Sequence, residues 1–279
     1  MQDDSAANFG SIARDLKSLA SNDSPECTLF RNVSFTEGQL VGADLKHADL
    51  AGRDLRRSNV QGADLGQANL ARADLTDADL TGANLTDAIL ASSSMIGAIL
   101  SSANLCHSMM TGVNLGRLTF EGATFRLADL SQCVFHNCRG NMASFERASL
   151  FATQWSDTVV EDGNFEFADL RNAVFTRCWF GRSCFVGAAL EGAQFIECDL
   201  TGADFYWSDF DDSKCFNCEL KGIRRPEEQK IAYGPKGVKP PVVIPKPLYR
   251  QAITDEERQK LLASCLEPPS ETTESEPKK

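Results

Sequence analysis

The sequence lacks the features that would indicate a secreted or membrane-bound protein. Its N-terminus, Met-Gln-Asp-Asp, has neither the basic region nor the apolar stretch of a signal peptide. No run of apolar residues has the length of a membrane span. We therefore expect a cytoplasmic protein that does not contact a membrane.

The sequence also lacks the motifs that carry most enzyme chemistry. It has no glycine-rich phosphate loop and no cluster of residues with metal-ligand spacing. Only three histidines are present, His47, His107 and His136. We therefore predict no cofactor and no metal.

A period of five residues dominates the rest of the sequence. Every fifth residue from Phe30 to Leu220 is a core type, through 39 consecutive positions of which 19 are Leu and 13 are Phe. Two residues before each of them, a small residue fills 35 of the 39 sites. A helix needs apolar recurrence at three and four residues and a strand needs it at two, so a sustained five fits neither. A fixed short period indicates a solenoid of stacked units.

Units such as Ala-Asp-Leu-Thr-Asp and Ala-Asn-Leu-Thr-Asp resemble the pentapeptide-repeat family, whose unit is A-(D/N)-L-x-x. The resemblance covers residues 26–220. It implies an all-β fold, a right-handed quadrilateral β-helix with four units to a coil and about ten coils, whose central and small residues point inward. At ~4.8 Å per coil, the rod would be roughly 47 Å long.

Steps of twenty residues sort the central positions by face. One face changes from leucine to an aromatic ladder in the second half of the chain. We expect the rings of this ladder to stack in the core, with adjacent pairs in offset contact. The ladder consists of Phe125, Phe145, Phe165, Phe185 and Phe205.

Two misfits and the cysteines test this register. Arg53 occupies an inward small site, where an unpaired guanidinium would be costly, so we expect a backbone bulge or an outward side chain. Gly140 leaves a central position empty, to be filled by Met142 or by a shifted Phe120.

Five cysteines at inward small sites are interpreted as packing thiols, although the last three stack closely enough for a bridge or a soft metal in principle. They are Cys133, Cys138, Cys178, Cys198 and Cys218.

Outside the repeats we expect helices and tails. Residues 1–25 form an N-terminal capping helix, with Phe9, Ile12, Leu16 and Leu19 at helical spacing. Residues 221–253 are a proline-rich basic tail, 254–266 a C-terminal helix and 267–279 a disordered tail. The C-terminal helix is predicted to cap the rod, and it is also a candidate homodimer interface.

The surface offers no catalytic constellation. His47 and His107 share a face but lie three coils apart, ~14 Å at strand spacing, which is too far for mutual hydrogen bonding. Cys106 and His107 are adjacent, as in an activated nucleophile, but both fill variable outward positions of the repeat. We therefore predict that the protein is not an enzyme.

The repeat region is acidic, with 26 acidic and 14 basic residues between 26 and 220. The main hypothesis is a non-enzymatic scaffold that binds a protein partner. The resemblance implies an alternative, a DNA mimic that binds type II topoisomerase (gyrase), gives quinolone protection and does not bind nucleic acid directly. Duplex DNA ~47 Å long would carry about 28 charges, more than twice the net charge of this rod. A second alternative is a secreted bacterial effector.

The candidate interaction residues fall into two groups. Ile89 and Met109 replace the usual Asp or Asn and should lie one above the other, with Ile99 nearby. The second group combines aromatic and acidic residues at the C-terminal end of the rod, an arrangement that is frequent at interface centres. It comprises Asp204, Tyr206, Trp207, Asp209, Asp211 and Asp212.

Overall fold

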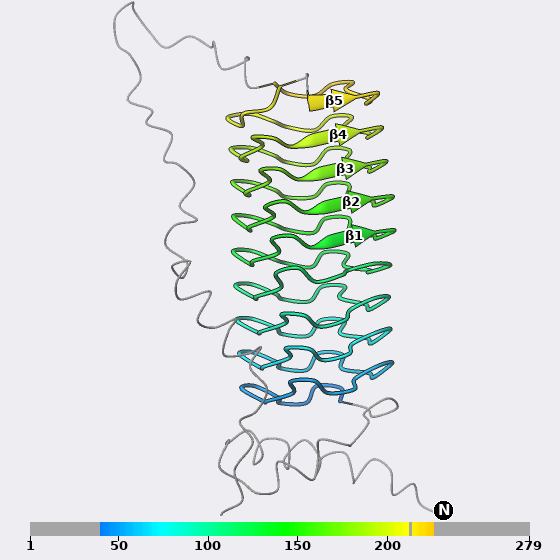
Figure 1. The fold of residues 1–279 in the computed structure, drawn as a ribbon, viewed down its shortest axis with the longest axis vertical. Helices are drawn as coiled ribbons and strands as arrows, with labels where there is room; N and C mark the ends of the chain where they lie inside the picture. Colours follow the sequence, from blue (N-terminus) through cyan, green and yellow to red (C-terminus); the bar gives the residue numbers. More distant parts are fainter. Residues whose placement is uncertain (1–39, 212–213, 226–279) are drawn as a thin grey trace, which may run out of the picture.

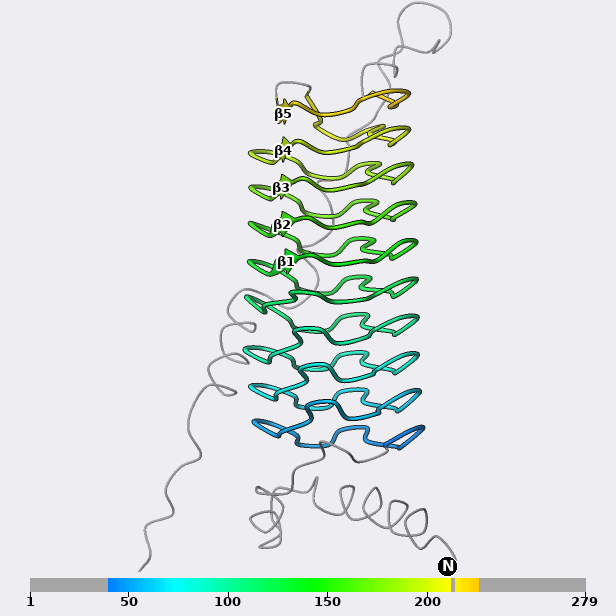
Figure 2. The same ribbon diagram turned by 90° about the vertical axis from the view of Figure 1, so that its right-hand side faces the viewer.

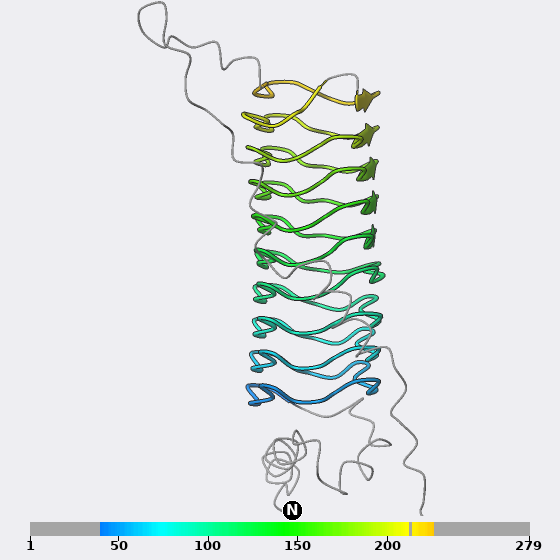
Figure 3. The ribbon, with the colours of Figure 1, turned by 60° about the vertical axis from the view of Figure 1, so that its left-hand side comes forward.

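The computed structural model describes residues 40–211 and 214–225. They form a straight stack of coils, seen from three sides in Figures 1, 2 and 3. The fold is a right-handed quadrilateral β-helix, as the family resemblance implies. Its regular strands are β1 (Val134–His136), β2 (Gln154–Ser156), β3 (Val174–Thr176), β4 (Gln194–Ile196) and β5 (Cys215–Phe216).

Each coil takes twenty residues, so a paired residue finds its partner twenty positions further on. The five strands form one parallel sheet in the order β1-β2-β3-β4-β5, with Phe135 opposite Trp155 and Trp155 opposite Phe175. Isolated parallel bridges continue the same register on the other faces, for example Asp44 with Asp64 and Asp49 with Asn69. The described residues contain no proline, so none of these rungs lacks an amide donor.

The corners of the coil are β-turns with a repeated backbone requirement. The small residue donates its amide hydrogen to the carbonyl of the preceding central residue, as Ala48 does to Leu45 at 3.0 Å. The residue before the small one has a positive φ, between about 50° and 75°, as in a type II turn. Glycine fills many of these corners, and no β-branched residue fills any that the structure describes. Branching at Cβ makes the left-handed region costly, which explains this selection.

The interior is a continuous column of buried side chains, and the predicted phenylalanine ladder is confirmed. Successive rings from Phe125 to Phe205 are stacked, with centroids 4.8, 5.0, 4.8 and 4.8 Å apart. A second ladder on the opposite face meets the first edge-on, for example at Phe145 and Trp155 (5.7 Å, 82°). Each such pair stabilises the fold by about 0.5–1.5 kcal/mol beyond the burial of its surface, so the aromatic contacts stabilise the stacking of coils in the second half of the rod.

The empty central position at Gly140 is filled by Phe120. A Cβ built on Gly140 would overlap the Phe120 ring, whereas Met142 is exposed. Of the two predicted fillings, the shifted Phe120 is therefore the one observed. The ring also contacts Phe125, Phe135 and Phe145 edge-on, at 5.8 to 6.0 Å.

The prediction for Arg53 is wrong in both of its forms. The backbone does not bulge, because Arg53 donates to Leu50 and accepts from Asp74, the same two bonds that Ala73 makes with Leu70 and Ser94. The side chain does not escape either, because the residue is only 9% exposed. Arg53 is not without an interaction partner, so the cost of an unpaired buried guanidinium does not arise.

The repeat geometry continues past Leu220. Phe205 donates to the carbonyl of Arg224, and Asp204 and Arg224 form a parallel bridge. The predicted capping helix at 1–25, the C-terminal helix at 254–266 with its homodimer role, and most of the basic tail lie outside the described residues. Within the residues that are described, no helix is long and apolar enough to cross a bilayer.

Candidate interaction surfaces

The first predicted group does not form one apolar patch. Ile89 and Met109 do lie one above the other, as predicted, in a parallel bridge. Met109 is only 8% exposed, however, so it offers little surface. Ile99, 37% exposed, belongs to the ladder of Asp79 and Thr119, half a coil away on the opposite face. The expectation that Ile99 lies near Ile89 is therefore wrong, because ten residues correspond to half a turn of this coil.

The aromatic pair at the C-terminal end is brought together. Tyr206 and Trp207 occupy the second and third positions of one turn, and their rings stack at 4.9 Å and 23°. Trp207 has a positive φ of 59°, which turns its side chain away from the rod, and it is 42% exposed. A large ring held on a rigid corner provides contact area at little entropic cost.

Asp204 and Arg224 extend this pair into a four-residue cluster. Arg224 Nη1 lies 3.1 Å from Asp204 Oδ2, and its guanidinium carbon lies 3.9 Å from the centre of the Tyr206 ring. Asp204 Oδ1 accepts a hydrogen bond from the amide of Tyr206 at 2.9 Å. We call Asp204, Tyr206, Trp207 and Arg224 the end cluster. The sequence did not indicate Arg224 as a member, because its residue range reads as the start of the basic tail.

The remaining predicted acids behave differently from one another. Asp209 Oδ1 accepts a hydrogen bond from the amide of Leu190 at 2.5 Å, and Lys214 Nζ donates to the carbonyl of Leu190 at 2.9 Å. Asp209 Oδ1 therefore takes the place of the backbone carbonyl that accepts this bond in other coils, and Lys214 adds a second bond to a carbonyl that already accepts from Ala193. Asp211 is exposed, and Asp212 lies outside the described residues.

Many aspartates and asparagines have a structural task in the turns. The side-chain oxygen before the central residue accepts a hydrogen bond from the amide two residues on, as in Asp64 with Gly66 (3.0 Å) and Asp199 with Thr201 (2.8 Å). Asn84 Nδ2 also donates to Asp64 Oδ1 in the coil below, at 2.8 Å. Such side-chain turns stabilise the corner itself. The acidity of the repeat is therefore partly a requirement of the fold.

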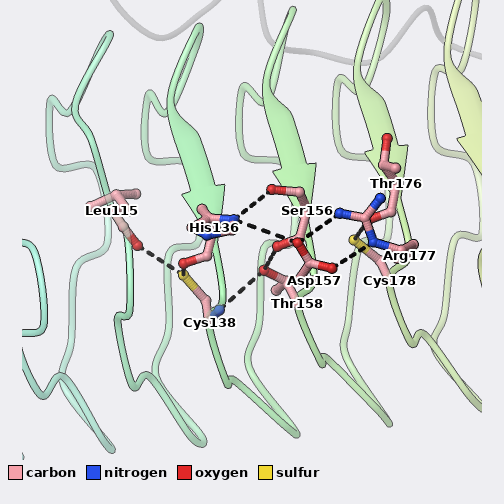
Figure 4. Close-up of polar contacts among 9 residues, drawn as sticks. All are labelled: Leu115, His136, Cys138, Ser156, Asp157, Thr158, Thr176, Arg177 and Cys178. Atoms are coloured by element: carbon pink, nitrogen blue, oxygen red, sulfur yellow. Dashed lines mark hydrogen bonds and ion pairs between the residues drawn. The ribbon is translucent and has the colours of Figure 1, made fainter.

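A polar network crosses three coils beside β1, β2 and β3, as Figure 4 shows. His136 Nδ1 lies 2.9 Å from Ser156 Oγ and 3.7 Å from Asp157 Oδ2. Arg177 forms two hydrogen bonds with Asp157, at 2.7 and 2.9 Å, and these lower the pKa of the Asp157 carboxyl. Sequence reasoning missed this network, although the twenty-residue spacing of Asp157 and Arg177 would have indicated it.

The geometry of this network differs from that of a catalytic triad. In a triad the serine and the carboxylate bind opposite nitrogens of the imidazole, so that one orients the ring and the other gives up its proton. Here Ser156 and Asp157 both approach Nδ1 of His136. The arrangement ties neighbouring coils together and does not form a proton relay.

The described cysteines are free thiols, and the inward ones pack in the core. Cys133 and Cys138 donate to carbonyls of the preceding coil, those of Met110 and Leu115, each at 2.8 Å. Burial raises the pKa of Cys133 to about 12 and that of Cys138 to about 11. The described residues contain no group of three ligands that could hold a metal. The interpretation as packing thiols is confirmed for these two.

The fold and the surface together define a class of protein. It is a solenoid whose interior is filled by inward side chains and whose faces are built from parallel rungs. Matches to the family described as pentapeptide repeats, in 8 copies, fall within residues 54–137 and 185–214. These stretches carry pentapeptide repeats, and the fold of the chain is the pentapeptide-repeat β-helix.

Solved structures of the same fold resemble the chain at low identity. HetL, a pentapeptide repeat protein involved in heterocyst differentiation regulation from the cyanobacterium Nostoc sp. strain PCC 7120, is 20% identical over 72% of this chain and 94% of its own, with a TM-score of 0.31. QnrB1, a plasmid-mediated fluoroquinolone resistance protein, is 14% identical over 60% and 90%, with a TM-score of 0.27.

A third structure has higher identity over a shorter stretch. A pentapeptide repeat protein from the thylakoid lumen of Arabidopsis thaliana is 30% identical over 41% of this chain and 66% of its own, with a TM-score of 0.21. No curated protein matches the sequence. The repeats are what the chain shares with these proteins, and none of these similarities indicates a particular function.

Proposed function

We propose that this chain is a non-enzymatic protein-interaction scaffold that engages a protein partner through the end cluster. The observation that carries the proposal is the exposed Trp207 ring, which stacks on Tyr206, while the guanidinium of the Asp204–Arg224 pair lies over the Tyr206 ring. Exposed tryptophan, tyrosine and arginine are the residues most enriched at energetic centres of interfaces. The rigid coil beneath them lowers the entropy lost on binding.

A quantitative pull-down tests this proposal, with Trp207→Ala as the variant and Trp179→Ala as the matched control. Both rings are exposed to a similar extent, but Trp179 lies in a different ladder, between Val159 and Asp199. The scaffold proposal requires a partner that wild type and Trp179→Ala retain and Trp207→Ala loses. Identical sets of bound proteins for all three chains would contradict it.

The acidic surface favours a second candidate, a DNA mimic that binds type II topoisomerase. This candidate predicts that the purified chain relieves ciprofloxacin inhibition of gyrase supercoiling. Asp204 and Asp209 accept hydrogen bonds from backbone amides, so charge reversal at these two residues would disturb the fold as well as the surface charge. Glu191→Lys with Glu197→Lys is the better variant, because both residues are exposed. No relief by the wild-type chain would exclude this function.

We further propose a cytoplasmic location for the scaffold. The alternative, a secreted bacterial effector, would carry the same end cluster to a partner in a host cell. Fractionation of cells that express the tagged chain separates the two, because a cytoplasmic scaffold stays in the cell lysate and an effector is recovered from the medium or the host.

A further inference from the structure

The last described coil of the rod carries two cysteines that flank a single corner. Cys215, Phe216, Asn217 and Cys218 follow one another, and the first two form β5, which Figure 1 shows at the end of the stack. Each corner of the repeat lies between two inward positions, that of a central residue and that of the next small residue. Among the corners that the structure describes, this is the only one with cysteine at both positions. We call Cys215 and Cys218 the terminal dithiol.

Both side chains of the terminal dithiol point toward the interior. Cys215 pairs with the buried Phe195, and both cysteines are partly buried and pack against the core. Cys218 Sγ accepts a hydrogen bond from the amide of Cys198 at 3.4 Å and donates to the carbonyl of Phe195 at 3.3 Å. Asn217, with a φ of 54°, turns the chain between the two cysteines. The two thiols therefore enter the same part of the core from the two ends of one corner.

The two sulfur atoms are in direct contact. The thiol of Cys215 donates a hydrogen bond to the sulfur of Cys218. A disulfide has a bond of about 2 Å and requires its two Cβ atoms to be directed toward one region. Rotation of the two side chains about their Cα–Cβ bonds can close the contact to this length. The corner therefore already has the arrangement that a disulfide between the two residues needs.

The terminal dithiol is also the pair of inward thiols that an oxidant in solution can reach. Both of its members are partly exposed, and accessibility is one condition for thiol reactivity. Cys198 contacts Cys218 from the preceding coil and is a competing partner, but it is 2% exposed. The other described inward thiols are at most 3% exposed, and they are Cys133, Cys138 and Cys178.

We propose that Cys215 and Cys218 form a reversible disulfide by exchange with a low-molecular-weight disulfide such as oxidised glutathione. One cysteine loses its proton to water, and its sulfur attacks the oxidant, breaks the sulfur–sulfur bond and releases one thiolate. The second cysteine, also deprotonated, attacks the mixed disulfide, forms the Cys215–Cys218 bond and releases the second thiolate. Two electrons pass from the two cysteines to the oxidant, which leaves as two thiols.

The surroundings of the site make this exchange slow and its effect local. Burial raises the pKa of Cys218, so little of the reactive thiolate is present at neutral pH. The disulfide would close the corner just before Glu219, whose amide donates to the carbonyl of Cys198 at 2.9 Å. It would thus constrain the coil that continues to Arg224. The site stands independently of any partner that the end cluster binds.

Peptide mapping of the full chain tests the site. The folded protein is equilibrated with oxidised glutathione, freed of the oxidant, alkylated with iodoacetamide in denaturant and digested with trypsin. Trypsin releases residues 215–221 as one peptide, whose only cysteines are the terminal dithiol. Mass spectrometry should find this peptide without alkyl groups and lighter by two hydrogen atoms. Dithiothreitol before alkylation should restore two alkyl groups.

A second tryptic peptide is the matched control. Residues 127–139 also carry two inward cysteines, both buried, and this peptide should take up two alkyl groups in every sample. Cys198→Ser should leave the internal disulfide of 215–221 unchanged, whereas Cys215→Ser should abolish it. The proposal is overturned if the wild-type peptide 215–221 takes up two alkyl groups, retains glutathione, or is recovered joined to residues 183–214, the peptide that contains Cys198.

Discussion

The carboxylate of Asp209 accepts a hydrogen bond from the amide of Leu190, at 2.5 Å, where other coils offer a backbone carbonyl. The amide of Leu190 therefore has a side-chain acceptor in place of the backbone carbonyl of the next coil. A solenoid face that ends in this way has fewer free backbone groups with which to pair another chain.

Asp209→Ala should destabilise the C-terminal coils by roughly 1–3 kcal/mol, since it leaves the amide of Leu190 without its acceptor. The measurement is chemical denaturation followed by circular dichroism. Glu191→Ala, an exposed acid next to Leu190, is the control and should change stability by less than about 0.5 kcal/mol. Equal losses for the two variants would show that the Asp209 contact contributes nothing specific.

Gly140→Ala should destabilise the rod, because the added Cβ overlaps the Phe120 ring. Overpacking of this kind typically costs about 1–3 kcal/mol. The double variant with Phe120→Leu should recover part of the loss, since a smaller side chain vacates the slot. Strictly additive effects in the double-mutant cycle would contradict the filling of Gly140 by Phe120.

Ser108 and Ser183 should respond oppositely to alanine. Ser183 Oγ donates to the carbonyl of Val160 at 2.7 Å, whereas the buried Ser108 Oγ has no hydrogen-bond partner. Ser183→Ala should therefore cost about 1 kcal/mol, and Ser108→Ala should be neutral or stabilising. Thermal denaturation of both variants measures the difference, and a larger loss for Ser108→Ala would refute the assignment.

Ala152→Gly should raise stability by about 0.5–1 kcal/mol, because Ala152 has a φ of 55° and glycine adopts that region without strain. Ala189→Gly, at the position before a central residue, where φ is not positive, should lower it by a similar amount. Denaturant midpoints of the two variants give the comparison. A loss of stability in both would mean that the corner conformation is not strained by a side chain.

Cys133 makes the stability depend on alkaline pH. Its folded pKa is raised to about 12 by burial, so the folded state keeps the thiol proton while the unfolded chain loses it above its ordinary value of 9.0. Its contribution is full below pH 9 and is lost as the pH rises toward 12. Stability measured between pH 8 and 11 should fall less steeply for Cys133→Ala than for wild type, and parallel curves would contradict the shift.

The interior could be predicted from the sequence because spacing alone decides which side chains point inward. Phe125 and Phe145 lie twenty residues apart, and a coil of twenty stacks them whatever surrounds them. The prediction for Arg53 failed because the free-energy cost of burying a guanidinium depends on whether it has an interaction partner, and residue spacing does not reveal the partner. Ile99 was misplaced because ten residues reverse the face.

The end cluster could be predicted only in part. Tyr206 and Trp207 were evident as departures from the repeat, but Arg224 joins them because the coil continues beyond Leu220, into a range whose composition resembles a tail. The bond from Asp209 to Leu190 depends on a local departure from the ladder, which no periodicity encodes. Such contacts require the coordinates of side chains from different coils.

The affinity of the retained partner for the rod tests the scaffold function most directly. Isothermal titration of the partner identified with wild type should give at least a tenfold weaker binding constant for Trp207→Ala, and an unchanged constant for Trp179→Ala. Circular dichroism should show both variants folded, because both side chains lie outside the core. Equal affinities for Trp207→Ala and wild type would contradict the end cluster as the binding site.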